Sequence, residues 1–291
     1  MIRPSLPAIA RRIPHPRTRF APSPTGYLHL GHVVNAIYVW GIARALDGRV
    51  MLRIEDHDRI RCRPEFEAAL IEDLEWLGFE PDEGTNPPHR QSDHSSSYEH
   101  ALATLREHGH VFSCICSRKE IGGERYPGTC RSRGIKAGPG TGLRVALDDE
   151  AERFDDLMLG PTVQTPATQC GDLLLKDRDG HWTYQFAVTV DDQLHGIDLV
   201  VRGTDLLAST GRQIKLARML GRAVPPHFLH HPLIVKPGGD KLSKASGDSG
   251  VRDLRRAGLS APEVIGRAAA AVGLLDHPRP LTAAKVPSLF Q

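Results

Sequence analysis

The sequence has no long hydrophobic run. None of its apolar stretches approaches the roughly 20 residues that a membrane-spanning helix needs. The first residues also lack the apolar core of about 7–15 residues that a secretory signal peptide carries. We therefore expect a cytoplasmic protein with no membrane contact. The composition, 40% apolar and 25% charged, is typical of a globular fold.

A strong excess of positive charge is also missing. The 291-residue chain has 37 Lys and Arg residues against 35 Asp and Glu, which gives a net charge of +2 at pH 7. This balance excludes a globally basic nucleic-acid binder, so any RNA contact must use local patches. Residues 1–17 contain four arginines and no acid. We expect them to form a disordered basic tail, with a phosphate-binding arm as the alternative.

Cysteine is scarce and odd in number. Of the five cysteines, Cys62 and Cys170 stand alone and are expected to be packing residues. The other three lie close together in the sequence, at Cys114, Cys116 and Cys130. In a reducing compartment such a cluster favours a metal over disulfides, and zinc normally takes four tetrahedral ligands. From the residues alone, His110 is a candidate fourth ligand, and three free thiols are the alternative.

The apolar residues near the N-terminus predict a βαβ unit. Residues 18–21 and 49–56 are mostly apolar and predict two strands. Between them, a turn at 22–26 containing Pro and Gly precedes a helical pattern that begins near His32 and stops at Asp47-Gly48. Because a helix connects the two strands, the strands should be parallel.

Further along, helical and strand patterns alternate around an interruption. Helices are expected at 64–77, 93–108 and 210–220. Strands are expected at 184–190, at 196–201 and at the start of the segment 232–250. Ser260 and Glu263 form a capping box that begins a last helix. Residues 110–180 break this alternation with cysteines and a Gly-rich stretch, which predicts an insertion with its own fold.

The segment RFAPSPTGYLHLGH, residues 19–32, places two histidines at the mouth of a helix. A helix N-terminus offers unpaired N–H groups and the positive end of the helix dipole, which suit a phosphate. His29 and His32 can add side-chain donors, and Gly31 can let a flat base or ribose approach the backbone. The alternative is a pair of ordinary surface or capping histidines.

A second segment, DKLSK, places Lys241 and Lys244 three residues apart in a loop rich in Gly and Ser. Lysine is a mobile point charge that can follow a phosphate, and a flexible loop can close over a nucleotide. By itself the segment could be a solvated charged loop. The two segments together, in this order, indicate a nucleotide site.

These two segments resemble the HIGH and KMSKS motifs of class I aminoacyl-tRNA synthetases. His29-Leu30-Gly31-His32 is similar to the first; residues 241–245, KLSKA, are similar to the second, with Leu for Met and Ala for the final Ser. The segments RIEDHD, YQFAVTVDD and VRGTDLL resemble the glutamyl branch. The likeness extends from about Arg19 to Lys244.

The resemblance implies an α/β fold with a Rossmann-type (HUP-like) parallel-sheet catalytic domain. Residues 18–109 would be its first half and residues 181–239 its second. Residues 110–180 would be an acceptor-binding-like insertion with a zinc site. Residues 240–291 would hold the KMSKS-like loop and a short helical C-terminal part.

The resemblance also implies an ATP-dependent activation of L-glutamate. His29, His32, Lys241 and Lys244 would stabilise the transferring phosphates. The nucleotide would contact Pro22, His29, Gly31, His32 and Lys244. Glutamate would contact Arg19, Ala21, Ser23, Glu55, Tyr184 and Arg202. Which arginine meets which carboxylate stays open. Mg²⁺ would accompany ATP, although no dedicated carboxylate cage is readable in the sequence.

The same resemblance bears on the metal and on the acceptor. In the family pattern the fourth zinc ligand is a tyrosine, which makes the set Cys114, Cys116, Tyr126 and Cys130, with the zinc structural. Only 47 residues follow Lys244, too few for a separate anticodon-binding domain. The chain therefore resembles the shortened glutamyl-Q branch. This resemblance implies that glutamate is transferred to queuosine in tRNA(Asp). We expect the protein to be a monomer.

Three other functions are compatible with the motifs. One is a truncated synthetase that charges a tRNA 3′ end. Another is a different ATP-using nucleotidyltransferase. The last is a non-catalytic RNA-binding or amino-acid-sensing protein, although such a descendant need not keep His29, His32, Lys241 and Lys244.

Overall fold

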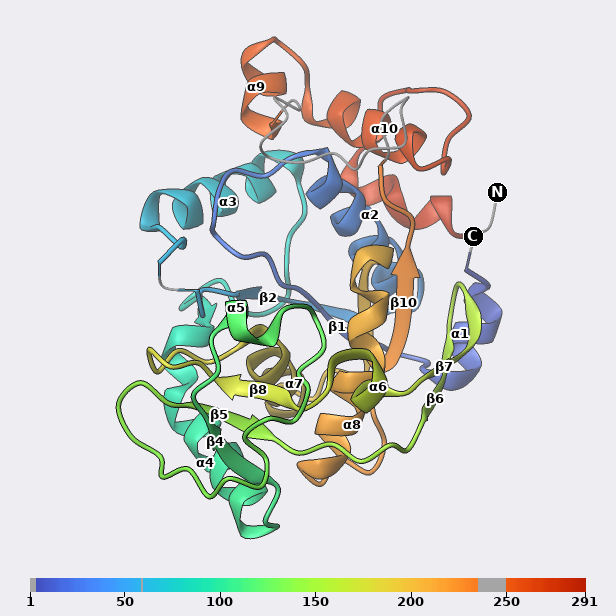
Figure 1. The fold of residues 1–291 in the computed structure, drawn as a ribbon. Coiled ribbons are helices and arrows are strands. Elements are labelled where there is room, and N and C mark those ends of the chain that lie inside the picture. The colour runs from blue at the N-terminus through green and yellow to red at the C-terminus, as the bar shows by residue number, and fades with distance from the viewer. Residues whose placement is uncertain (1–3, 59, 235–249) are drawn as a thin grey trace.

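The chain folds around a parallel β-sheet with helices on both faces (Figure 1). The structure is a computed structural model that describes residues 4–58, 60–234 and 250–291. Two parallel pieces lie side by side in it: a three-stranded sheet of β1 (Arg17–Phe20), β2 (Arg49–Ile54) and β3 (His89–Arg90), and a two-stranded sheet of β9 (Leu199–Gly203) and β10 (His227–His231). Strand β2 pairs in parallel with β1 and β3, and β9 pairs in parallel with β10. Strand β9 lies beside β1, where the N–H of Asp198 donates to the carbonyl of Arg17 at 3.1 Å.

Alternation along β9 shows how the two faces of the sheet are covered. Leu199 and Val201 join the core that contains helix α2 (Leu30–Ala45), whereas Val200 packs with Ile214 of helix α8 (Thr210–Met219). Successive side chains of a strand point to opposite faces, so a strand buried on both sides is apolar throughout. The expected α/β fold and the parallel β1–β2 pair are confirmed.

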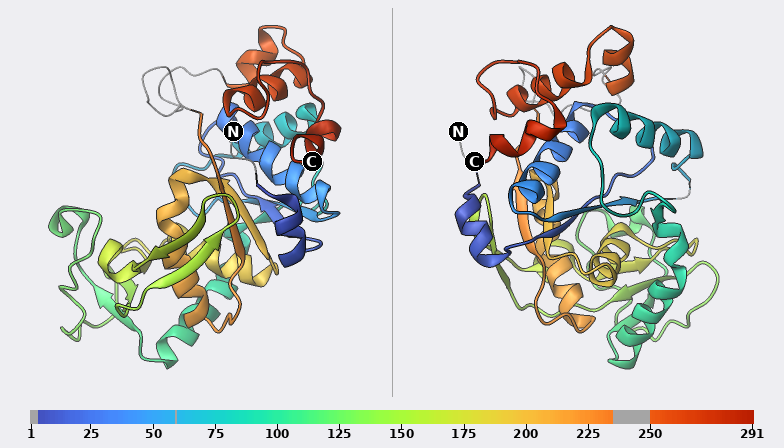
Figure 2. Two further views of the ribbon diagram at one scale, coloured as in Figure 1. Left: turned by 90° about the vertical axis from the view of Figure 1, so that its right-hand side faces the viewer. Right: turned by 180° about the vertical axis from the view of Figure 1, so that it is seen from behind.

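Helix α2 is almost entirely buried because the C-terminal part of the chain folds back over it (Figure 2). Helix α10 (Ala261–Ala271) and the 3₁₀ helix η4 (Ala283–Leu289) pack against it, and helix α9 (Val251–Arg256) precedes them. A Cβ on Gly41 would lie 2.2 Å from the ring of Phe290, so only glycine permits this contact. The predicted capping box between Ser260 and Glu263 begins α10.

A second core forms at the other end of the molecule. It joins helix α4 (Ser95–Glu107) and helix α7 (Tyr184–Leu194) to an antiparallel sheet of β4 (Val111–Cys114), β5 (Gly142–Val145) and β8 (Leu173–Lys176). Tyr98, Val145 and Phe186 meet there. The segment 110–180 thus has its own sheet but shares its core with the flanking helices α4 and α7, which differs from the expectation of a separate fold.

The remaining elements are short, with one exception. The hairpin of β6 (Glu152–Asp156) and β7 (Gly160–Gln164) reaches back to β10, and helix α3 (Pro64–Leu77) has the predicted bounds. The others are the 3₁₀ helices η1 (Gln91–His94) and η2 (Thr204–Ser209) and the helices α5 (Arg118–Ile121) and α6 (Pro166–Cys170). No helix in these described ranges is long and apolar enough to cross a membrane.

Two strand predictions need correction. Residues 184–190 belong to helix α7, because a short apolar run does not distinguish a strand from a buried helix. The strand expected at the start of 232–250 lies earlier, in β10, and ends at His231 before Pro232, which has no N–H to donate. The strand expected at 196–201 is observed as β9. Lys241 and Lys244 lie outside the described residues.

The expected disordered tail is also wrong for residues 5–17. Helix α1 (Leu6–Arg12) begins there, capped by the Ser5 side chain, which accepts from the N–H of Ala8. Ile9 is 1% exposed and belongs to the main core. The arginine-rich composition favoured a disordered tail in the prediction. The two isoleucines of the segment, Ile9 and Ile13, are buried and hold it in place.

The buried side chain of Ile9 allows a prediction about the stability of the fold. Ile9→Ala should lower the free energy of unfolding by about 2–4 kcal/mol, because it removes a buried branched side chain and leaves a cavity. Urea unfolding followed by circular dichroism measures the change. The control is Arg11→Ala in the same helix, at an exposed position, which should stay within about 0.5 kcal/mol. Equal stability of the two variants would mean that the segment does not pack.

Candidate active site

A cavity of about 280 Å³ opens at the carboxyl ends of β1, β2 and β9, beside the start of α2. Ligands of open α/β sheets bind at this edge. Eight residues predicted from the sequence line it: Arg19, Ala21, His29, Gly31, His32, Glu55, Tyr184 and Arg202. Their convergence from segments as far apart as β1 and β9 supports the sequence-based site. Glu55 and Arg202 are 5% and 4% exposed. This burial excludes the simplest alternative for each, an ion-pair residue on the protein surface.

His29 and His32 cap helix α2 and each other. The N–H of Gly31 donates to Nδ1 of His29, and the N–H of His29 donates to Nδ1 of His32, both at 3.1 Å. Since each Nδ1 accepts a hydrogen bond, the ring proton of a neutral imidazole must be on Nε2. The two rings lie 4.0 Å apart between centroids. The capping alternative is therefore observed, and capping fixes both rings as Nε2–H donors at the cavity wall.

The absence of a side chain at Gly31 makes room for the ring of His29 and not for a base or ribose. A Cβ on Gly31 would lie 2.9 Å from Cε1 of His29, closer than such contacts allow. The room above this glycine, expected to admit a base or ribose, is thus occupied by the His29 ring. Glycine at this position is what lets the ring fold over the first turn of α2.

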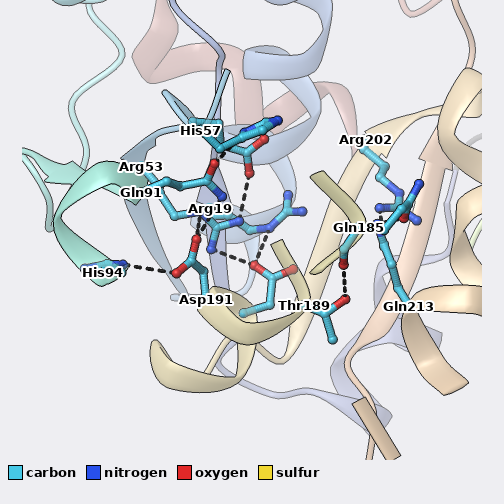
Figure 3. Close-up of polar contacts among 12 residues, drawn as sticks. Arg19, Arg53, His57, Gln91, His94, Gln185, Thr189, Asp191, Arg202 and Gln213 are labelled. Carbon is cyan, nitrogen blue, oxygen red and sulfur yellow. Dashed lines mark hydrogen bonds and ion pairs between the residues drawn. The ribbon is translucent and has the colours of Figure 1, made fainter. Parts of the chain in front are cut away.

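A buried ion network supports one wall of the cavity (Figure 3). The fully buried guanidinium of Arg53 donates to Glu55 at 3.0 Å and to Asp192 at 2.8 Å. Arg19 donates from Nε to the same oxygen of Asp192 at 3.1 Å. Burial alone would raise the pKa of Asp192, but Arg19 and Arg53 outweigh it and hold that pKa at about 2. The hydrogen bond from Arg53 holds the side chain of Glu55 at the cavity wall.

Asp191 extends this network away from the cavity. It accepts hydrogen bonds from Nε2 of Gln91 at 2.8 Å and from the Tyr98 hydroxyl at 2.9 Å, and Nδ1 of His94 lies 3.0 Å away. Its Oδ2 is 3.9 Å from Nε of Arg53. No role for Arg53, Asp191 or Asp192 is predicted from the sequence. The available signal was their charge within the apolar segments RIED and TVDD.

Arg202 lies in a different electrostatic environment. It donates to His230 at 3.0 Å, to Gln213 at 2.7 Å and to Thr210 at 3.0 Å, all neutral acceptors. Because the guanidinium can only donate, Nε2 of His230 is unprotonated, and Nδ1–H donates to Asp156 at 2.6 Å. Burial lowers the pKa of Arg202 and that of His230.

Pro22 and Ser23 stand beside the cavity and do not line it. The carbonyl of Pro22 accepts from the N–H of Glu55 at 3.0 Å, so it helps to place that carboxylate. Oγ of Ser23 lies 3.6 Å from Sγ of Cys62. Cys62 is partly exposed there, whereas Cys170 is buried in the second core as a packing residue.

The cysteine cluster brings four candidate ligands together. The sulfurs of Cys114, Cys116 and Cys130 lie within 4.8 Å of one another. The hydroxyl of Tyr126 is 3.5 Å from Sγ of Cys114 and accepts from the N–H of Cys130 at 2.8 Å. His110 is not in this group among the described residues, and its ring stacks on His108. The donor set fits a closed thiolate site for zinc, completed by the tyrosine.

Comparison with known proteins decides the family. The class I tRNA synthetase (E and Q) catalytic domain matches residues 16–260. A Symbiobacterium thermophilum protein named glutamyl-Q tRNA(Asp) synthetase is 42% identical, over 90% of this chain and 88% of its own length. A Burkholderia mallei protein of the same name is 45% identical, over 79% of this chain and 81% of its own length. The chain belongs to the glutamyl-Q tRNA(Asp) synthetase family.

Solved structures agree with this membership. A glutamate tRNA ligase from Elizabethkingia meningosepticum, in complex with its amino acid, superposes with a TM-score of 0.78 at 26% identity. The match covers 94% of this chain but 64% of that ligase. A Mycobacterium tuberculosis methionyl-tRNA synthetase, with a TM-score of 0.55 at 12% identity, shares the fold alone. This family member is therefore a ligase with the class I synthetase catalytic fold.

The ion network of this family member yields a pH prediction. The pKa of Asp192 is lower in the folded protein than the value of 3.8 for the unfolded chain. Its ion pairs therefore stabilise the fold above pH 3.8, and this stabilisation is lost as the pH falls toward about 2. Asp192→Asn should therefore cost about 3 kcal/mol of unfolding free energy at pH 7. The difference from wild type should stay constant down to about pH 4.5 and shrink below pH 3.8.

Urea unfolding at a series of pH values measures this difference, with Asp149→Asn at an exposed position as the control. A difference that already declines between pH 7 and pH 5 would show that Asp192 is not held ionised by the two arginines.

Proposed function

We propose that the protein activates L-glutamate with ATP, without tRNA, and transfers it to the queuosine base in the anticodon loop of tRNA(Asp). The observation that carries this proposal is one cavity in which the Nε2–H donors of His29 and His32 lie with Arg202 and Glu55. The first pair suits a phosphate and the second an amino acid. The name shared by the relatives supports the acceptor.

Glutamate fits the charges of this cavity. No carboxylate in the described ranges of the chain forms an ion pair with Arg202, so a substrate carboxylate would supply the missing counter-charge. Glu55, held by Arg53, offers a carboxylate to the substrate ammonium. Tyr184 lines the same cavity, and burial, reinforced by Glu55, raises its pKa, so its neutral hydroxyl adds a hydrogen-bonding group.

Activation needs positioning and charge stabilisation more than a protein nucleophile. A glutamate carboxylate oxygen would attack the α-phosphorus of ATP, forming the mixed anhydride as the bond to pyrophosphate breaks. His29 and His32 would donate to phosphate oxygens as charge shifts, with Lys241 and Lys244 stabilising the leaving pyrophosphate. Mg²⁺ would enter bound to ATP. Such donors are worth roughly 10²–10³ in rate when they fit the transition state.

Transfer then requires only a suitably placed hydroxyl. The adenylate is already activated, so a hydroxyl of the queuosine cyclopentene diol would attack its carbonyl and release AMP. This diol is similar to the ribose diol of a tRNA 3′ end, which makes 3′-end charging the main alternative.

Zinc belongs to the same proposal. Cys114, Cys116, Cys130 and Tyr126 would hold one structural zinc ion per chain. The ion would cross-link β4 to the loop around Tyr126, where the segment has few other buried groups. The three thiols and the tyrosine would contribute no step to the chemistry in the cavity.

Arg202 provides the test of glutamate binding. Arg202→Leu should raise the KM for glutamate in ATP–pyrophosphate exchange by roughly ten- to a hundred-fold, because a charge-assisted hydrogen bond is lost. The KM for ATP should change much less. Arg49→Leu, with a side chain 74% exposed, is the matched control and should leave both constants unchanged. An unaltered KM for glutamate in Arg202→Leu would remove this arginine from the amino-acid site.

The acceptor is tested with defined RNAs. Radiolabelled glutamate should be transferred to tRNA(Asp) that carries queuosine and not to the unmodified transcript. It should still be transferred when the terminal adenosine lacks its 2′ and 3′ hydroxyls. Label that depends on those hydroxyls would instead establish 3′-end charging. Absence of glutamate-dependent pyrophosphate exchange would favour the non-catalytic alternative.

A further inference from the structure

Three histidines meet on the far side of the ion network from the cavity. His89 comes from β3, His94 from η1, and His195 is the residue that ends α7. One ring nitrogen of each lies within 4.8 Å of the others. The ring of His195 is 5.2 Å from each of the other two rings, measured between centroids. The cluster has no part in the chemistry described above.

His94 is oriented in the way that metal-binding histidines usually are. Its Nδ1 lies 3.0 Å from the Asp191 carboxylate, which itself accepts from Tyr98 and Gln91 (Figure 3). With Nδ1–H donated to a carboxylate, the lone pair is on Nε2, and the ring cannot easily turn. A histidine that binds a metal commonly donates its other ring N–H to a carboxylate.

His195 provides a second, independent observation. It is 9% exposed, and its Nδ1 is buried with no hydrogen-bond partner in the described part of the chain. A buried polar atom without a partner is rare and calls for an explanation. A bound cation would supply the missing interaction.

The charges around the cluster tolerate a cation. Arg53 repels it, but the adjoining network of two guanidinium groups and three carboxylates carries one net negative charge.

We propose that His89, His94 and His195 form a second metal site, for a borderline transition-metal ion such as Zn²⁺, with the remaining position open to water. Imidazole ligands suit this class of ion. A tetrahedral ion with metal–nitrogen distances of about 2.1 Å spaces its ligands roughly 3.4 Å apart, so the rings of His89 and His195 would move toward His94 when the ion binds. Through Asp191 and Arg53, the ion would brace the wall that holds Glu55.

Cobalt titration separates this site from the cysteine cluster. Metal-free full-length protein should take up two equivalents of Co²⁺. One should show thiolate-to-cobalt charge transfer; the other, bound by nitrogen, should show visible d–d absorption only. His195→Gln and His89→Gln should each lose the second equivalent and keep the charge-transfer band.

The control is His100→Gln, an exposed histidine on α4, which should keep both equivalents. Circular dichroism confirms that each variant is folded, and His89→Gln, at the edge of the cluster, covers the case in which His195→Gln does not fold. The proposal of a second site would be wrong if the wild-type protein took up one equivalent of Co²⁺, bound by thiolates. It would also be wrong if the His195 and His89 variants kept both equivalents. Neither result depends on glutamate activation or transfer.

Discussion

The buried guanidinium of Arg53 is the interaction on which the rest of the site depends. It joins the end of β2, through Glu55, to the last turn of α7, through Asp192. Removing one partner of such a buried set costs about 3–5 kcal/mol, because an uncompensated charge stays behind in the interior. The same group therefore fixes the fold where two distant segments meet and fixes a carboxylate at the cavity wall.

Arg202 shows what a similar side chain does with different neighbours. Both arginines are buried, but Arg53 is neutralised by carboxylates of the protein, whereas the acceptors around Arg202 are neutral. A charge left without its counter-ion destabilises the unliganded protein and is compensated when an anion binds. Arg53 is thus held by carboxylates of the protein itself, whereas under the proposed function the counter-charge of Arg202 would come from the substrate.

The sequence predicted what depends on local pattern and missed what depends on distant contacts. The bounds of α3, the βαβ unit and eight cavity residues follow from periodicity and from motif likeness. The burial of Ile9 depends on tertiary packing, and the pairing of Arg53 with Asp192 joins residues 139 positions apart, neither of which one sequence reveals. His89, His94 and His195 carry no recognisable spacing, so only the fold brings them together.

The mistaken strand at 184–190 shows why the helical state matters for function. In a helix, with about 100° per residue, Tyr184, Asp191 and His195 fall within roughly 40° of one face. Helix α7 thus spans about 16 Å, from Tyr184 at the cavity, past the ion network, to His195 in the histidine cluster.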